Sequence, residues 1–285
     1  MLLKGKDVAN AINEKTKKQV QLLKENGIIP TVAIFRVGNN ENDLAYEKGI
    51  DTRCNQVNIQ VKKYLFSEDV KPEDFYQELQ KANNDSNIHG ILVFRPLPSQ
   101  FKDSEVRNFI NPIKDIDGCS DSSLAGVFTN TDLGFAPCTA QAAMEILDYY
   151  GIEVKSKNVT VIGRSLVVGK PLSMLLLNKN ATVTICHTKT LDLKQKAKQA
   201  EILILATGQM ESINSEYVSN GQTVIDVGIS WNEKKQKLCG DVLFEEVEPL
   251  VENITPVPGG VGSVTTSVLI SHVAIAALKQ NAIQA

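Results

Sequence analysis

Short apolar runs alternate with amphipathic helical stretches along most of this 285-residue chain. In the first half, strands are expected at 31–37, 59–66 and 88–94, with helices at 44–57 and 72–83 between them. A second series of strands is expected at 158–163, 181–186, 201–207 and 222–229, with a helix at 168–179 after the first of them. Strands that alternate with helices pair in parallel. The sequence therefore predicts an α/β fold built from two such series.

A loop-rich stretch from about residue 111 to 137 separates the two series. It contains the turn signals DIDG and NTDLG, and a helix ending at Gly151 follows it. We place the domain boundary near residue 140. The expected domains are 1–140, joined by the C-terminal helix 264–285, and a Rossmann-like domain over 141–263. A Pro/Gly loop at 254–262 precedes that last helix, which we expect to pack on the first domain.

Composition narrows the possible classes of protein. The net charge of −3 lacks the basic excess of a nucleic-acid-binding protein, and no apolar run is expected to span a membrane. The first twenty residues lack the pattern of a signal peptide. Five scattered cysteines, with no CxxC pair, indicate reduced thiols rather than disulfides or a metal site. A cytoplasmic globular protein without a metal is expected.

The segment IGRSLVVGKP (162–171) lies between a predicted strand and a helix. A dinucleotide pyrophosphate binds at such a helix N-terminus, where glycines allow the backbone to approach closely. Gly163, Arg164, Ser165 and Gly169 are therefore candidate cofactor-binding residues. The spacing is not the common GxGxxG, and an ordinary strand–helix turn remains the alternative.

The end of the next strand indicates which cofactor is bound. NAD-selective sites usually carry an acidic residue there for the ribose hydroxyl. This strand instead ends in Cys-His-Thr-Lys-Thr, and Arg164 lies in the glycine turn. Cationic and hydroxyl groups suit a 2′-phosphate. The sequence favours NADP over NAD, with His187 and Thr188 at the site, although His187 could equally be a surface residue at a strand end.

Several motifs together resemble the methylenetetrahydrofolate dehydrogenase/cyclohydrolase family. They are VIGRSLVVGKP, TVTICHTKT, VIDVGI, GDVLFEEV and ITPVPGGVG in the second half, and FRVGNN, GILVFRPLP, KDIDG and PCT in the first. The resemblance implies a bifunctional enzyme of folate one-carbon metabolism, usually a homodimer. Such an enzyme oxidises 5,10-methylenetetrahydrofolate with NADP and then hydrolyses the methenyl product. It also implies a cleft between two α/β domains, with a tetrahydrofolate derivative held mainly by the N-terminal one.

The resemblance also assigns roles to individual residues. It implies catalytic and substrate-binding roles for Tyr46 and Asp117, whose carboxylate suits the amino-pyrimidinone edge of a pterin. A plain turn residue before Gly118 is the alternative for Asp117. The remaining assignments are Phe94, Arg95, Pro258, Gly259 and Gly260 for substrate, and Gly208 and Ile229 for cofactor.

The departures from the family pattern gather where folate should bind. The family has a lysine four residues after the tyrosine, and this chain has Ile50. The family's Gln-Leu before Pro-Leu-Pro is Phe94-Arg95 here. A lysine with a lowered pKa can move the protons that hydrolysis requires, and the glutamine orients it. We therefore expect the cyclohydrolase step to be lost or weak.

Two other functions remain open at this point. Asp43, Phe94 and Arg95 could reshape the pocket for a different dehydrogenase substrate. The chain could also be a non-catalytic NADP-binding subunit that pairs with a true member of the family.

Overall fold

A computed structural model describes residues 1–284, which divide into two compact units. The N-terminal unit comprises residues 11–138 with residues from 266 onwards, and the C-terminal unit comprises residues 1–10 with residues 139–265. Residues 1–10 thus group with the later unit and not with the domain that the sequence suggested. The cause is local, because the Leu3 N–H donates to Ile254 O at 2.8 Å and Leu2 forms a parallel bridge to Ile254.

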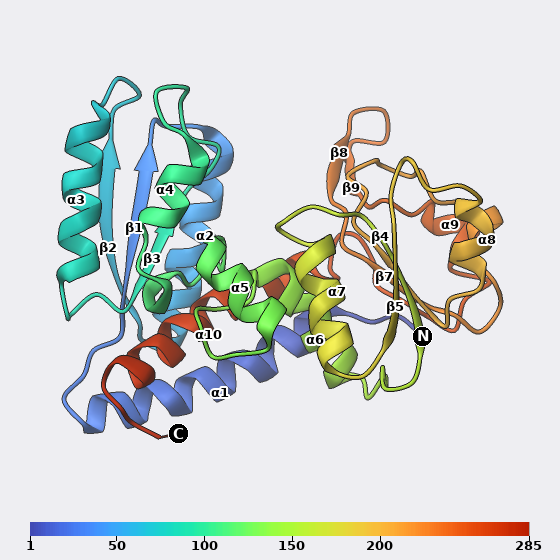
Figure 1. Cartoon of the computed structure of the whole chain (residues 1–285), viewed down its shortest axis with the longest axis horizontal. Coiled ribbons are helices and arrows are strands. Elements are labelled where there is room, and N and C mark those ends of the chain that lie inside the picture. The colour runs from blue at the N-terminus through green and yellow to red at the C-terminus, as the bar shows by residue number, and fades with distance from the viewer. Residues whose placement is uncertain (285) are drawn as a thin grey trace. The chain divides into compact units, whose positions relative to one another are not determined.

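The N-terminal unit is built on a parallel sheet with the strand order β2-β1-β3 (Figure 1). Two of the helices described with it, α1 and α10, run across the division between the units. The elements are α1 (Gly5–Glu25), β1 (Thr31–Val37), α2 (Glu41–Val57), β2 (Gln60–Phe66), α3 (Pro72–Asn84), β3 (Gly90–Val93), α4 (Asp103–Phe109), a 3₁₀ turn (Pro112–Lys114), α5 (Asp121–Thr129) and α10 (Gly262–Gln280).

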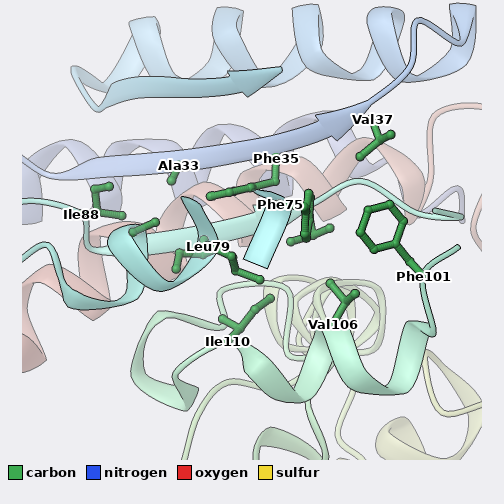
Figure 2. Packing of buried hydrophobic residues seen from close by; sticks show 12 residues of the cluster. Ala33, Phe35, Val37, Phe75, Leu79, Ile88, Phe101, Val106 and Ile110 are labelled. Carbon is green, nitrogen blue, oxygen red and sulfur yellow. The ribbon is translucent and has the colours of Figure 1, made fainter. Parts of the chain in front are cut away.

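One face of this sheet packs against α3 and α4 (Figure 2). Phe35 on β1 is fully buried, and its ring meets the edge of Phe75 on α3 with centroids 5.7 Å apart. Val106 of α4 closes the same cluster. Since side chains alternate across a strand, Ala33, Phe35 and Val37 point to this face. The opposite face of the sheet packs against α2.

An ion-paired cluster holds α2 on the sheet. Arg36 on β1 and Glu47 on α2 are both buried, with Arg36 Nε 2.8 Å from Glu47 Oε2. Lys63 on β2 pairs with Glu47 at 2.9 Å and with Asp51 at 2.6 Å. These contacts fix the rotation of α2, and with it the direction in which Tyr46 points.

The C-terminal unit contains a five-stranded parallel sheet with the order β10-β7-β6-β4-β5. Its elements are α6 (Cys138–Tyr149), β4 (Asn158–Ile162), α7 (Gly169–Asn178), β5 (Thr182–Cys186), α8 (Leu193–Lys198), β6 (Ile202–Leu205), a 3₁₀ turn (Ser215–Tyr217), β7 (Thr223–Asp226), a hairpin of β8 (Ser230–Asn232) and β9 (Lys237–Cys239), α9 (Phe244–Val247) and β10 (Asn253–Ile254). Because β5 and β6 flank β4 on opposite sides, the chain reverses direction across the sheet at β4, which is where such sheets bind ligands.

Some elements differ from the sequence-based expectation. The loop expected over 111–137 contains α5, whose first turn is capped by Ser120 Oγ accepting from Ser123 N at 3.1 Å. The helix α10 is long and apolar enough to span a membrane on length and composition alone, but most of it is buried within the protein. All five cysteine thiols are free.

Candidate active site

The glycine turn after β4 has a backbone that only glycine can adopt. Gly163 has φ of +143°, and a Cβ there would lie 2.3 Å from Ala206 O. A Cβ on Gly169, the first residue of α7, would lie 2.2 Å from Gly163 O. The two glycines therefore let the turn close against the end of β6. Ser165 Oγ accepts from Val168 N at 3.1 Å and shapes the entry to the helix.

A pocket of about 270 Å³ lies at this turn. It is bounded by the ends of β4, β5 and β6, and it holds five of the predicted cofactor residues: Gly163, Arg164, Ser165, His187 and Thr188. His187 itself belongs to a tight turn, in which its N–H donates to Thr190 Oγ1 at 2.8 Å and its Nδ1 accepts from Lys189 N at 3.1 Å. The two predicted segments, far apart in sequence, are thus brought together.

The groups in this pocket fit a dinucleotide with a 2′-phosphate. Arg164 is exposed and lines the pocket. The residues that line this pocket include no acidic side chain that would repel a phosphate. Ser212 Oγ, which also lines the pocket, is buried and has no hydrogen-bond partner within residues 1–284. An unpaired buried hydroxyl favours a polar ligand. The glycine turn, Arg164 and Ser212 together make a site that NADP suits.

A second pocket of about 240 Å³ lies in the same unit. Ile229 and the backbone of Asp226–Gly228 form one side, and the Pro256–Ser263 loop forms the other. Pro258, Gly259 and Gly260, predicted to contact substrate, therefore share this pocket with Ile229, predicted to contact cofactor. Gly208 lines neither pocket, and its N–H donates to Asp241 Oδ2 at 3.3 Å.

In the N-terminal unit, Tyr46 of α2 meets Phe94, the residue that follows β3. Their ring centroids are 5.4 Å apart, with the rings tilted by 39°. Phe94 is buried, whereas Tyr46 keeps 40% of its surface exposed. Burial of the hydroxyl, together with the charge of Asp117, raises the pKa of Tyr46. The phenol therefore stays protonated and can donate a hydrogen bond.

Ile50 lies one helical turn after Tyr46 and is fully buried. Lys48 is exposed, and Arg53 is half-buried on the next turn. The position where the family carries its lysine is thus an apolar part of the interface between α2 and the rest of the unit.

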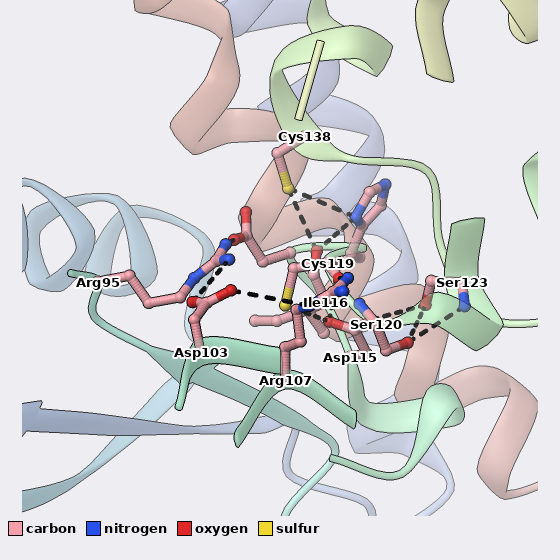
Figure 3. A network of polar contacts seen from close by, with 11 residues as sticks. Arg95, Asp103, Arg107, Asp115, Ile116, Cys119, Ser120, Ser123 and Cys138 are labelled. Carbon is pink, nitrogen blue, oxygen red and sulfur yellow. Dashed lines mark hydrogen bonds and ion pairs between the residues drawn. The ribbon is translucent and has the colours of Figure 1, made fainter. Parts of the chain in front are cut away.

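Arg95 and Asp117 form an ion pair that the sequence did not suggest. Arg95 Nη2 lies 3.0 Å from Asp117 Oδ2, and Nη1 lies 3.5 Å from Asp103 Oδ1. Figure 3 shows that the network continues from Asp103 to Arg107. Arg107 Nε lies 3.7 Å from Asp103 Oδ2, and Arg107 Nη1 lies 2.7 Å from Asp121 Oδ1. Arg95 is therefore held in place by two carboxylates.

Asp117 is half-buried in a polar setting. Burial raises its pKa to about 6, while the Arg95 guanidinium opposes the shift and neighbouring Asp115 adds to it. Asp115 itself is fully buried and holds the turn, accepting from Ser120 N at 2.8 Å and from Ser123 Oγ at 2.6 Å. Asp117 is thus ionised at neutral pH and close to its titration range.

Behind this turn, His272 of α10 donates through Nδ1 to Ile116 O at 2.8 Å, because a carbonyl can only accept. Burial lowers the pKa of His272 to about 4. The Cys138 thiol donates to the same carbonyl at 3.2 Å, and burial raises the thiol pKa well above its ordinary value. Both groups are neutral and hold the Asp117 turn from the inside.

Sequence reasoning missed two residues that organise the C-terminal unit. Asp226 and Asp241 are both buried and both accept backbone N–H groups of the loops around the two pockets. The available signal was an aspartate at the end of the apolar strand TVID, where an isolated charge would be costly without partners.

Two models of known protein families match this chain. Residues 3–117 match the family model "Tetrahydrofolate dehydrogenase/cyclohydrolase, catalytic domain", and residues 137–281 match its "NAD(P)-binding domain". A "Bifunctional protein FolD" of Clostridium kluyveri is 49% identical over 281 residues, covering 99% of each chain.

Solved structures agree with this match. The FolD methylenetetrahydrofolate dehydrogenase/cyclohydrolase of Campylobacter jejuni is 35% identical, with a TM-score of 0.94, over 98% of this chain and 99% of that one. A FolD of Trypanosoma brucei complexed with NADP and an inhibitor is 29% identical, with a TM-score of 0.90, over 99% of this chain and 98% of that one.

Proposed function

The chain belongs to the tetrahydrofolate dehydrogenase/cyclohydrolase family, and on that premise we propose that it oxidises 5,10-methylenetetrahydrofolate to 5,10-methenyltetrahydrofolate with NADP. We propose further that its cyclohydrolase step is lost or weak. The observation that carries the second statement is the fully buried Ile50, one turn from Tyr46, at the position where the family has a lysine.

The N-terminal unit supplies the groups for binding a folate. The Asp117 carboxylate can accept hydrogen bonds from the amino-pyrimidinone edge of a pterin, and the partly exposed ring of Tyr46, which packs on the buried Phe94, offers an aromatic surface. Oxidation of the methylene carbon requires positioning more than proton transfer. Bound NADP supplies the hydride acceptor, and Gly163, Arg164 and Ser165 would hold its phosphates.

Hydrolysis of the methenyl product makes a different demand, because water must lose protons. Ile50 and Phe94 have no group that can accept one. The Arg95 guanidinium stays charged in proteins and cannot serve as a base. The Asp117 carboxylate can accept a proton, but it is paired with Arg95 and assigned to the pterin edge. General acid–base assistance contributes about 10²–10⁴-fold, so its loss removes most of the hydrolytic rate.

The test is two assays of one purified protein. Reduction of NADP should accompany the appearance of methenyltetrahydrofolate absorbance. The decay of added methenyltetrahydrofolate should stay close to the rate without protein. Rapid decay catalysed by the wild-type protein would contradict the proposed loss of hydrolysis and leave the dehydrogenase assignment intact.

The Arg95–Asp117 pair also favours a second candidate, a dehydrogenase for another substrate. If Arg95 stays on Asp117, the carboxylate has less capacity for a pterin, and an anionic substrate could instead pair with the guanidinium. Protein that binds NADP tightly but does not oxidise methylenetetrahydrofolate would support this candidate over the first. Protein that binds NADP and oxidises neither methylenetetrahydrofolate nor any anionic substrate tested would point to the non-catalytic subunit.

We also propose that the chain forms a homodimer. The strand β5 lies at the edge of its sheet, and Thr182, Thr184 and Ile185 on it are exposed. An open strand edge with an exposed apolar side chain is a ready surface for pairing with another chain. Light scattering of the wild type and of Ile185→Lys tests this, and a wild-type monomer at micromolar concentration would contradict it.

A cytoplasmic location is the last part of the proposal. It is supported by the five free cysteines, since reduced thiols are typical of reducing compartments. Fractionation of cells with an antibody to the native protein tests it, and recovery outside the cytoplasm would contradict it.

A further inference from the structure

Two buried carboxylates lie side by side at the carboxyl ends of the central strands of the C-terminal unit. Asp226 ends β7, and Asp241 follows the hairpin of β8 and β9. Asp226 Oδ1 accepts from Asp241 N at 3.1 Å, and Asp226 Oδ2 accepts from Val242 N at 3.0 Å. The side chain of one aspartate therefore binds the backbone of the other.

Each carboxylate also holds a loop that forms part of a pocket wall. Asp241 Oδ2 accepts from Thr207 N at 2.6 Å, and Thr207 lines the pocket at the glycine turn. Asp226 Oδ1 accepts from Gly228 N at 2.9 Å, and Gly228 lines the second pocket. The Asp226 N–H donates to Thr255 Oγ1 at 2.7 Å, next to the Pro256–Ser263 loop. The pair thus connects the walls of both pockets.

Two glycines leave the space that the pair occupies. A Cβ on Gly228 would lie 2.3 Å from Asp241 Oδ1, and a Cβ on Gly240 would lie 2.0 Å from Asp226 Oδ2. The two carboxylates occupy the space that a side chain at either position would need. The tight fit indicates that the backbone is shaped to receive these two side chains.

Burying two neighbouring carboxylates is unfavourable for the free energy of folding. Burial raises the pKa of Asp226 to about 7, the charge of Asp241 adds to the rise, and three backbone N–H groups oppose it. Asp241 Oδ1 is buried without a hydrogen-bond partner among the described residues. The titratable groups that face Asp226 across a small neighbouring pocket are Glu211, Lys237, Cys239 and Glu245. Perturbed carboxylates of this kind gather at functional sites.

We propose that Asp226 and Asp241 are positioning residues that hold the walls of the glycine-turn pocket and of the second pocket in their binding conformation before NADP arrives. Neither side chain needs to touch the cofactor, because each acts through the backbone N–H groups that it binds. A preformed pocket spends less of the binding free energy on ordering its loops. This inference rests on the assignment of NADP to the pocket at the glycine turn.

Calorimetric titration with NADP, well below the melting temperature of each variant, tests the proposal. Asp241→Ala should weaken NADP binding about tenfold or more, because two N–H groups lose their acceptor. Asp241→Asn keeps an acceptor oxygen and should recover part of the affinity. Gly240→Ala should also weaken binding, although Gly240 lines neither pocket, because its Cβ pushes on Asp226. Asp148→Ala, at an exposed carboxylate of the same unit, is the matched control and should bind normally.

A merely structural pair gives a different result. It would lower the melting temperature of Asp241→Ala and Gly240→Ala but leave the NADP affinity of the folded protein unchanged, and that outcome would overturn the proposal. Wild-type protein that binds no NADP would instead remove the cofactor assignment on which the proposal rests.

Hydrogen exchange of the wild-type protein provides a test that needs no variant. The segments 205–209 and 226–229 should exchange slowly before NADP is added, with little further protection afterwards. Fast exchange that slows only when NADP binds would show that the cofactor orders these loops itself, and would overturn the proposal even if every variant failed to fold.

Discussion

The Arg95 guanidinium donates to Asp117 Oδ2 at 3.0 Å, so the carboxylate assigned to the pterin already has a cationic partner. This guanidinium opposes the effect of burial, which by itself raises the pKa of Asp117. The pair therefore keeps Asp117 ionised at neutral pH. A substrate that binds this carboxylate must share it with Arg95 or displace Arg95 from it.

The first prediction concerns this pair. With the pKa of Asp117 at about 6, kcat/KM for methylenetetrahydrofolate should fall as the pH drops through 6, because the protonated carboxyl accepts hydrogen bonds poorly. Arg95→Leu should move the midpoint of this fall upward by about one pH unit, equivalent to about 1.4 kcal/mol. Arg95→Lys keeps the charge and serves as control. An unchanged midpoint in Arg95→Leu would show that the pair does not govern Asp117.

The second prediction concerns the missing lysine. Ile50→Lys alone should give little hydrolysis of methenyltetrahydrofolate, because the new ammonium group is buried beside apolar side chains. The gain in hydrolysis rate of the double variant Ile50→Lys with Phe94→Gln should exceed the sum of the gains of the two single variants, since the two groups act as a unit. Decay of methenyl absorbance measures all four proteins. Purely additive effects would argue against a cooperating pair.

The third prediction concerns cofactor choice. Arg164→Ala should raise the apparent KM for NADP about tenfold or more and leave that for NAD nearly unchanged, because only NADP carries the 2′-phosphate. Lys179→Ala, at an exposed lysine paired with Asp148, is the control. Equal increases for both cofactors would place Arg164 elsewhere on the dinucleotide.

The fourth prediction uses Trp231, the only tryptophan in the chain. It lies on β8, is 55% exposed, and stands two positions after Ile229, which lines the second pocket. Binding of NADPH should quench the tryptophan emission through energy transfer to the reduced nicotinamide. Trp231→Phe should abolish the signal while calorimetry shows unchanged binding. Unquenched emission at saturating NADPH would place the nicotinamide away from this pocket.

The fifth prediction concerns the ion pairs that anchor α2. Glu47→Leu leaves the buried Arg36 without its carboxylate and should lower the free energy of unfolding by about 3–5 kcal/mol. Arg36→Met with Glu47→Leu removes both charges and should recover much of this loss. Urea denaturation followed by circular dichroism measures the three proteins. A double variant no more stable than the single one would show that Arg36 is satisfied by its other contacts.

The sequence predicted those elements whose residues carry a strong local pattern. The strands over 31–37 and 158–163 were recognisable because apolar residues are continuous in strands buried on both faces. The helix α5 was missed, since Gly126 and the polar residues before it resemble a loop until Ser120 is seen to cap the first turn. Propensity alone does not reveal such a cap when turn signals surround it.

The site was predictable only where a motif carries its own geometry. Gly163 and Gly169 could be placed because a strand followed by a glycine turn and a helix has a known use. The Arg95–Asp117 pair joins residues 22 positions apart, and the Asp226–Asp241 contacts join the two sides of a hairpin. Pairings of this kind depend on how the elements pack, and no local pattern in the chain encodes them.

The division of the chain into units has a consequence for how the protein is made. Residues 1–10 belong with residues 139–265, and residues from 266 onwards belong with residues 11–138, so each unit is completed by the opposite end of the chain. At a synthesis rate of about 5–20 residues per second, the first unit waits on the order of ten seconds at the ribosome for its last segment. During that interval its α3 side can already be packed, while the surface meant for α10 is still bare. The nascent N-terminal unit is therefore incomplete until α10 has been synthesised.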